Sequence, residues 1–313
     1  ERLAKAYELP PLCPAYHFDG LGFKPGKAAC SNYAVGGGRI NNALQPGGNE
    51  APPSILRQLD DASAAGWNDG DVLAMDGGGN DIADLIRAYL GDASDPGDHY
   101  QQLLLTLLPA EALAALLAEP DGAATAGAVY MQELANLFAD AVVADALEDG
   151  ATRVVIANMP TVTFTPEFQL VLASIEQKVR LDTRMQLENL FLRWIGTFND
   201  TLAQRFAHEP QVRVVDIAQR FDAFMADPAQ FGLTNVTIPV CGAPGFDQVP
   251  LRSFADCTAQ ALAATPPPAG APNNPGWWQH FLFADAFHPT PYGHHLMADQ
   301  ALDVMASAGW VAR

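Results

Sequence analysis

Basic side chains are scarce in this 313-residue sequence, which has 17 Lys and Arg residues against 36 Asp and Glu and a formal net charge of −19. A protein that binds a phosphate backbone or an anionic membrane surface needs a positively charged face. We therefore expect no nucleic-acid partner. No apolar run reaches the roughly 18 residues that can cross a bilayer, so the sequence also predicts no transmembrane segment.

Cysteine is also rare, with four residues that fall into two local pairs. Cys13 and Cys30 flank one Gly/Pro-rich stretch, and Cys241 and Cys257 flank another. This placement favours two disulfides, each closing a loop of about 15 residues and stabilising the fold by about 3 kcal/mol. Disulfides indicate an oxidising compartment, and we expect a secreted or periplasmic protein, with four reduced thiols in the cytosol as the alternative. No metal site is expected, because no CxxC or HxxxH spacing occurs.

Short apolar runs alternate with longer helical patterns along the chain. The strand candidates are the runs at 71–75, 153–158 and 212–216, and a shorter apolar piece at 33–35. Helical spacing covers 54–65, a region from about 99 to 149 with breaks near Pro109 and Pro120, and 167–208. Strands that alternate with helices predict an α/β fold with a parallel sheet covered on both faces.

Residues 231–278 have the composition of a loop and contain the second cysteine pair. A loop of this length inside a compact domain is usually functional or disordered, and a disulfide would order it. We therefore expect a disulfide-closed insertion within a single domain that spans residues 1–313. Trp277 and Trp278 at its end are candidates for the wall of a substrate pocket, with a purely anchoring role as the alternative.

The segment at 285–289 sets a carboxylate three residues before a histidine, just ahead of the last predicted helix. A nucleophilic hydrolase needs an imidazole that accepts the proton of a serine, and a carboxylate that fixes the tautomer of that imidazole. Asp285 and His288 are therefore candidates for the acid and the base. An ordinary ion pair at a helix start is the alternative.

Two glycine clusters follow strand candidates. Gly36, Gly37 and Gly38 come after the apolar piece at 33–35, and Asn80 follows the strand at 71–75 by a few glycines. Ligands of open parallel sheets bind beyond the carboxyl ends of the strands. A backbone N–H and a side-chain amide aimed at one point form an oxyanion hole, although most glycine clusters alone are merely turns.

Taken in order, the segments 31–38, 78–81 and 285–289 resemble the second, third and fifth conserved blocks of the SGNH hydrolases, the GDSL esterase/lipase family. The resemblance runs from about residue 31 to residue 306, and 231–241 looks like secreted bacterial members. It implies a three-layer α/β/α, flavodoxin-like fold and a carboxylic ester hydrolase that acts on small-molecule or lipid esters without a cofactor. By this resemblance Gly37 and Asn80 are oxyanion donors, His288 is the general base and Asp285 orients it.

The first block of that family, a Gly-Asp-Ser-Leu motif with the nucleophilic serine, has no counterpart here. None of the serines follows a strand in a Gly-Asp-Ser setting; they are Ser31, Ser54, Ser63, Ser94, Ser174, Ser253 and Ser307. The chain also opens within a helical pattern at 1–9, without a signal peptide. We expect an N-terminally truncated esterase or lipase that lacks its first strand and is inactive as it stands. The alternatives are an inactive relative that binds an ester, lipid or glycan, and an unrelated α/β protein.

Overall fold

The computed structural model describes residues 2–27, 29–91, 98–178, 180–242 and 257–311. The chain divides into two compact units. The first unit comprises Glu1–Met159, Arg193–Val215 and Val304–Arg313, and the second comprises Pro160–Leu192 and Asp216–Asp303. Two helices, α8 (Leu181–Arg205) and α11 (Pro291–Ser307), contribute residues to both units. The expectation of a single domain over 1–313 stays a prediction.

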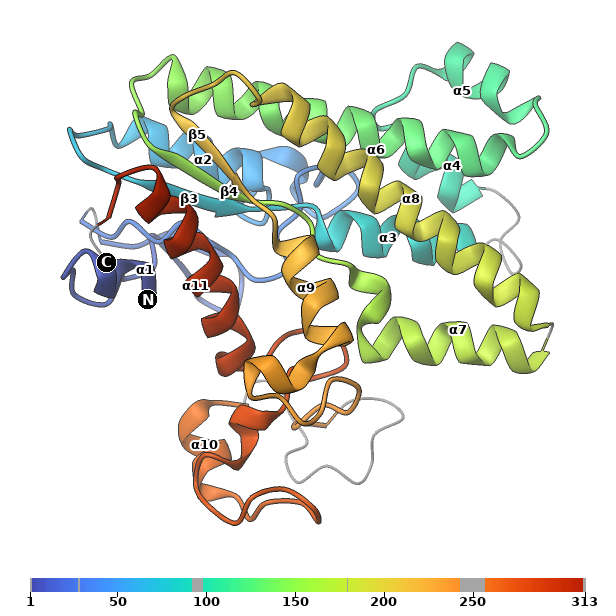
Figure 1. Ribbon diagram of the computed structural model, residues 1–313. Helices are drawn as coiled ribbons and strands as arrows, with labels where there is room; N and C mark the ends of the chain where they lie inside the picture. Colours follow the sequence, from blue (N-terminus) through green and yellow to red (C-terminus); the bar gives the residue numbers. More distant parts are fainter. Residues whose placement is uncertain (1, 28, 92–97, 179, 243–256, 312–313) are drawn as a thin grey trace. The chain divides into compact units, whose positions relative to one another are not determined.

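A parallel sheet forms the centre of the first unit. Its strands are β3 (Leu73–Asp76), β4 (Val154–Ala157) and β5 (Val212–Val215), paired in that order (Figure 1). Leu73 is in register with Val154, which in turn is in register with Val212. The middle strand is buried and consists of β-branched residues and alanine, as parallel strands covered on both faces require. All three predicted strands are confirmed, with ends that differ by at most two residues.

The helical regions predicted at 54–65 and 99–149 are present in the first unit, whereas its helix at 79–91 was not predicted. Between residues 48 and 150 the described α-helices are α2 (Ile55–Ala64), α3 (Gly79–Gly91), α4 (Asp98–Leu104), α5 (Ala110–Leu117) and α6 (Gly122–Ala141), which continues as the π-helical turn Val142–Leu147. Pro109 precedes the first residue of α5, and α6 begins after Asp121. At the start of α2 the Ser54 side chain accepts a hydrogen bond from the Arg57 amide, which caps the helix.

The N-terminal region differs from the prediction in two ways. Residues 33–35 lie outside any strand, and the chain near them is held by isolated bridges, Pro14 with Asn32 and Arg39 with Ser54. In addition, β1 (Tyr16–Phe18) and β2 (Phe23–Pro25) form an antiparallel hairpin that sequence patterns did not indicate. Strands of three residues are too short to display a recognisable alternation, which explains why the hairpin was missed. The helical start of the chain, α1 (Arg2–Ala6), was expected.

The second unit contains helices and irregular chain. Its helices are α7 (Pro166–Lys178), the first half of α8, α9 (Ile217–Ala226), α10 (Ala259–Ala264) and most of α11, with short 3-10 turns at Pro228–Phe231 and Trp277–His280. The single helix expected over 167–208 is two helices, because a new helix begins at Leu181 with Asp182 in its first turn, where a negative charge favours a helix start. The expected insertion at 231–278 is largely irregular where it is described; its residues 243–256 lie outside the described chain.

Candidate active site

The predicted backbone donor lies in a tight turn. Gly37 has φ of 77°, in the left-handed region that glycine adopts at little cost, and the Gly38 amide donates to the Val35 carbonyl at 3.1 Å. We call residues 36–41 the glycine loop. The predicted turn is therefore present, although the strand expected before it is not.

A second glycine turn joins β3 to α3. A Cβ on Gly78, whose φ is 95°, would meet the Met159 methyl at 2.5 Å, and one on Gly77 would meet the Ile40 side chain at 2.9 Å. Glycine is therefore favoured at Gly78 by both its φ and its surroundings, and at Gly77 by its surroundings alone. The turn allows α3 to begin at Gly79, directly after the strand, and this places Asn80 at the carboxyl end of the parallel sheet.

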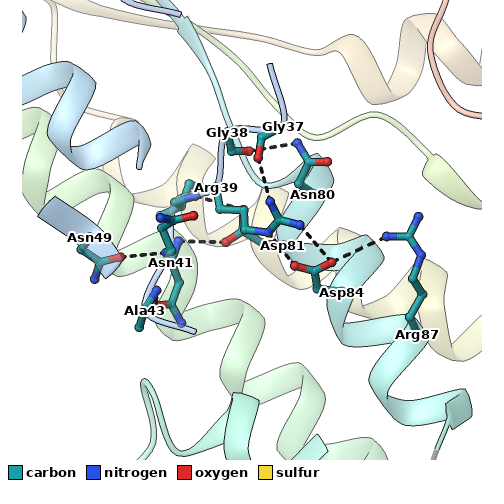
Figure 2. Close-up of polar contacts among 12 residues, drawn as sticks. Gly37, Gly38, Arg39, Asn41, Ala43, Asn49, Asn80, Asp81, Asp84 and Arg87 are labelled. Atoms are coloured by element: carbon teal, nitrogen blue, oxygen red, sulfur yellow. Dashed lines mark hydrogen bonds and ion pairs between the residues drawn. The ribbon is translucent and has the colours of Figure 1, made fainter. Parts of the chain in front are cut away.

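The structure brings the two predicted oxyanion residues together within the first unit. The Asn80 Nδ2 donates to the Gly38 carbonyl oxygen at 3.0 Å, next to Gly37 (Figure 2). An amide nitrogen carries two hydrogens, and this bond uses one of them. The glycine loop and the start of α3 thus form one hydrogen-bonded element.

Two carboxylates of α3 also reach the glycine loop, and neither was predicted as a site residue (Figure 2). Asp81 accepts hydrogen bonds from the amides of Ile40 and Asn41 at 3.0 and 2.8 Å. Asp84 accepts from Arg39 Nε at 2.6 Å. The sequence did contain a signal, since an aspartate directly after the candidate asparagine falls in the same helical turn.

The predicted dyad forms in the second unit. The Nδ1 atom of His288 lies 2.9 Å from Oδ2 and 3.1 Å from Oδ1 of Asp285. The Asp285 Oδ1 also accepts hydrogen bonds from the backbone amides of Phe287, at 2.8 Å, and His288, at 2.6 Å. The carboxylate therefore holds both the imidazole and the backbone that carries it.

The two side chains shift the pKa of one another. Burial pushes the pKa of Asp285 upward, but the hydrogen bonds from His288 and from two backbone amides outweigh this and lower it. The hydrogen bond to Asp285 raises the pKa of His288, against the smaller opposing effect of burial. With Nδ1–H donating to the carboxylate, the neutral imidazole has its acceptor at Nε2, as a general base requires. The His288 side chain is 47% exposed and that of Asp285 is 16% exposed.

Backbone pairing fixes the chain around the dyad, which we call the dyad loop, residues 281–290. The Ala284 amide donates to the His288 carbonyl at 2.8 Å, and the Cys241 amide donates to the Ala284 carbonyl at 2.7 Å. The Thr290 side chain donates to the Phe281 carbonyl at 2.9 Å and accepts from the Gly293 amide at the start of α11. The segment around Cys241 is therefore part of the support of the dyad.

Both predicted disulfides, Cys13–Cys30 and Cys241–Cys257, are confirmed. The second belongs to a buried cluster with Trp277 and Trp278, and the Trp277 Nε1 donates to the carbonyls of Leu262 and Thr265, each at 3.0 Å. Trp277 is fully buried and Trp278 is 7% exposed. Their burial fits the anchoring alternative, and a role in a substrate pocket stays a prediction.

Within the described residues, no group of three or more His, Cys, Asp or Glu side chains is arranged to hold a metal ion. No helix in the described chain has both the length and the apolar character needed to cross a membrane. The predicted donors Gly37 and Asn80 lie in the first unit and the dyad in the second, and each pair is assembled within its own unit.

One family model matches the chain, that of the GDSL-like lipases/acylhydrolases, over residues 2–301. No curated protein sequence gives a significant match. The matched region includes the glycine loop, the start of α3 and the dyad loop, and together with the parallel sheet it confirms the expected fold class. The chain therefore belongs to the GDSL-like lipase/acylhydrolase family, the SGNH hydrolases, which are hydrolases of the esterase/lipase type.

Proposed function

We propose that these residues supply the base, the acid and two oxyanion donors of a serine carboxylic ester hydrolase. The observation that carries the proposal is the dyad, in which both carboxylate oxygens of Asp285 lie within 3.1 Å of His288 Nδ1. The His288 side chain is 47% exposed, and Nε2 is the acceptor nitrogen of its neutral ring. Membership of a hydrolase family supports the same reaction class.

In the proposed mechanism a serine oxygen attacks the ester carbonyl while His288 Nε2 accepts the serine proton. Asp285 stabilises the resulting imidazolium. The Gly37 N–H and the second Asn80 N–H donate to the negative oxygen of the tetrahedral intermediate. The intermediate then collapses, the alcohol leaves with the proton from His288, and a water molecule repeats the sequence on the acyl-enzyme.

None of the serines in these 313 residues follows a strand in a Gly-Asp-Ser setting, and we propose that the nucleophile is not among them. Two of the described serines have local contacts: Ser54 is buried and caps α2, and Ser63 donates to Asp149 at 2.6 Å. Among the described strands β3 is paired on one side only, and its Ala74 and Asp76 are exposed. A parallel strand added to that edge would end beside the glycine turn that carries Asn80. We propose that the serine enters on such a strand, from a segment outside these residues.

The test uses the serine-bearing form, by which we mean these 313 residues joined to the segment that supplies the nucleophile. His288→Ala should lower the hydrolysis of a short-chain nitrophenyl ester by about 10⁴-fold, and Asn80→Ala by about 100- to 1000-fold. His295→Ala and Asn136→Ala are matched controls, because His295 also has an aspartate partner and Asn136 is also half-buried and hydrogen-bonded. Near-normal rates in either site variant would refute the assignment.

The second candidate function is binding without catalysis, in which the protein binds an ester, lipid or glycan and does not cleave it. The lack of a serine in a Gly-Asp-Ser setting favours this alternative. Covalent labelling with a fluorophosphonate separates the two. We expect no labelled serine in the 313-residue chain and one labelled serine in the serine-bearing form. A serine-bearing form that binds esters and resists labelling would favour the inactive relative.

We also propose a secreted or periplasmic location, because disulfides form and persist mainly in oxidising compartments. The substrate class that fits the family is a small-molecule or lipid ester.

A further inference from the structure

Asp81 is a buried carboxylate that the proposed mechanism does not use. The residue is 3% exposed and lies in the first turn of α3, directly after Asn80. Burial raises its pKa to about 6, in spite of the hydrogen bonds that it accepts from Asn41 and Ile40. A buried carboxylate is costly for a fold, so its position calls for a specific role.

Both oxygens of Asp81 act on the glycine loop. The Oδ2 atom accepts from the Ile40 amide and the Oδ1 atom accepts from the Asn41 amide, at 3.0 and 2.8 Å. These two amides are consecutive, so one side chain fixes both the position and the direction of the backbone at the end of the loop (Figure 2). Each bond is charge-assisted, which makes it stronger than a bond between neutral groups.

The other end of the loop is held by Arg39 and Asn80. Arg39 Nη1 donates to the Gly37 carbonyl at 2.8 Å, while its Nε and Nη2 donate to the two carboxylate oxygens of Asp84 at 2.6 and 3.3 Å. Asn80 Nδ2 binds the Gly38 carbonyl. Three residues in the first two turns of α3, namely Asn80, Asp81 and Asp84, therefore hydrogen-bond to the glycine loop from Gly38 to Asn41.

We propose that Asp81 is a positioning residue, which sets the distance and orientation of the Gly37 N–H relative to the Asn80 amide. This inference rests on the proposed function, which assigns those two groups as oxyanion donors. A displacement of about 1 Å in such groups can cost about 100-fold in rate. A carboxylate suits the task, because it has two acceptors and no donor, and both of its partners here are N–H groups.

The test combines backbone measurements on the 313-residue chain with kinetics on the serine-bearing form. In Asp81→Asn one oxygen is replaced by an NH₂ group that faces a backbone N–H, so one of the two bonds is lost while the volume is kept. We expect amide hydrogen exchange at Ile40 or Asn41 to accelerate at least about 10-fold. We expect kcat to fall about 100-fold with KM changed less than about 3-fold, because the donors act on the transition state.

Asp61→Asn is the matched control. Asp61 is also an aspartate of the first unit with two side-chain partners, Arg57 and Tyr16, but it lies on α2. The Asp61→Asn substitution should leave both kcat and amide hydrogen exchange in the glycine loop unchanged. Should Asp81→Asn fail to fold, Asp84→Asn replaces it; this change weakens the ion pairs of Asp84 with Arg39 and Arg87 and should lower kcat about 10-fold.

The outcomes are distinguishable. Faster exchange together with a lower kcat supports the inference. Unchanged exchange, or an unchanged kcat in a protein that Asn80→Ala still impairs, overturns the positioning role alone. If Asn80→Ala has no effect on kcat, the proposed oxyanion hole itself fails, and the role of Asp81 fails with it.

Discussion

The glycine loop and the dyad loop are held by different chemistry. The glycine loop is anchored to α3 by buried and half-buried carboxylates and by an asparagine. The dyad loop is anchored by backbone hydrogen bonds to the chain around Cys241, beside a disulfide and two buried indoles. The two loops should therefore respond to different perturbations, the first to protonation of a carboxylate and the second to reduction of a disulfide.

The two loops also differ in the pKa of the aspartate that supports each of them, Asp81 for the glycine loop and Asp285 for the dyad loop. Each carboxylate accepts hydrogen bonds from two consecutive backbone amides. The pKa of Asp81 is nevertheless raised to about 6, whereas the pKa of Asp285 is lowered. The difference lies in the remaining surroundings, because Asp81 is fully buried with Asp84 nearby and Asp285 has the imidazole of His288 as a partner. Backbone donors alone therefore do not determine the ionisation of a carboxylate.

The largest effect is expected from Asp285→Asn in the serine-bearing form. Loss of the carboxylate should lower kcat by about 10⁴-fold, since it both orients the imidazole and stabilises its protonated form. It should also lower the pKa of His288, because the hydrogen bond to Asp285 is the main cause of its raised value. The acid limb of the pH profile of kcat/KM should then move to lower pH. Asp299→Asn, which alters the partner of His295, is the control and should leave the limb in place.

The next effect concerns the disulfide beside the dyad loop. Replacing Cys241 and Cys257 together by serine should cost about 3 kcal/mol of unfolding free energy, because the bond closes a loop with a sequence separation of 16. Amide exchange at Ala284 should accelerate while exchange at Ile40 and Asn41 should not. The matching double replacement of Cys13 and Cys30, with a separation of 17, should cost a similar amount without affecting Ala284. Equal acceleration of amide exchange in both loops would contradict the separate anchoring of the two loops.

A somewhat smaller effect is expected from pH acting on Asp81. Because its pKa is raised in the folded chain, the folded state binds the proton more tightly than the unfolded state does, and stability should fall as pH rises from about 4 to about 6. The pKa shift of Asp81 corresponds to a change of roughly 2–3 kcal/mol in the free energy of unfolding. Urea unfolding of the wild type and of Asp81→Asn between about pH 4 and 6 measures the contribution of Asp81. The opposite contribution of Asp285 is present in both proteins and cancels in the comparison. Parallel pH profiles would show that Asp81 is not the group that titrates.

The smallest effects are expected from two helix caps, one near each loop. Ser54 accepts from the Arg57 amide at the start of α2, and Thr258 accepts from the Ala261 amide at the start of α10. Ser54→Ala and Thr258→Ala should each cost about 1 kcal/mol in urea unfolding. Exchange at Ile40 should respond only to the first, and exchange at Ala284 only to the second. A response of both amides to one cap would contradict the separate anchoring of the two loops.

The sequence predicted those features that depend on local spacing. The three-residue separation of Asp285 and His288 was sufficient, because a carboxylate and an imidazole so spaced can meet across one turn. The strands at β3, β4 and β5 were recognisable from apolar runs between helical patterns. The two cysteine pairs are close in sequence, and both disulfides form as predicted.

Features that depend on distant contacts were missed. The proposed role of Asp81 rests on hydrogen bonds with the amides of Ile40 and Asn41, about 40 positions earlier in the chain, and no local pattern reports such contacts. The same applies to Trp277, whose indole is enclosed by carbonyls of Leu262 and Thr265. A tryptophan beside a candidate catalytic motif has the same local sequence whether it faces a ligand or the interior.

The glycine turn between β3 and α3 has a consequence for how the site can vary. Gly77 and Gly78 leave no room for a Cβ, whereas Gly79 has no atom within 4 Å of its ideal Cβ position. A side chain at either position would have to displace Met159 or Ile40 or move the turn itself, and a moved turn would shift Asn80 and Asp81, which follow it. Substitutions at Gly77 or Gly78 are therefore expected to disturb the proposed donor Asn80 and the proposed positioning residue Asp81 together. Gly79→Ala is expected to disturb neither.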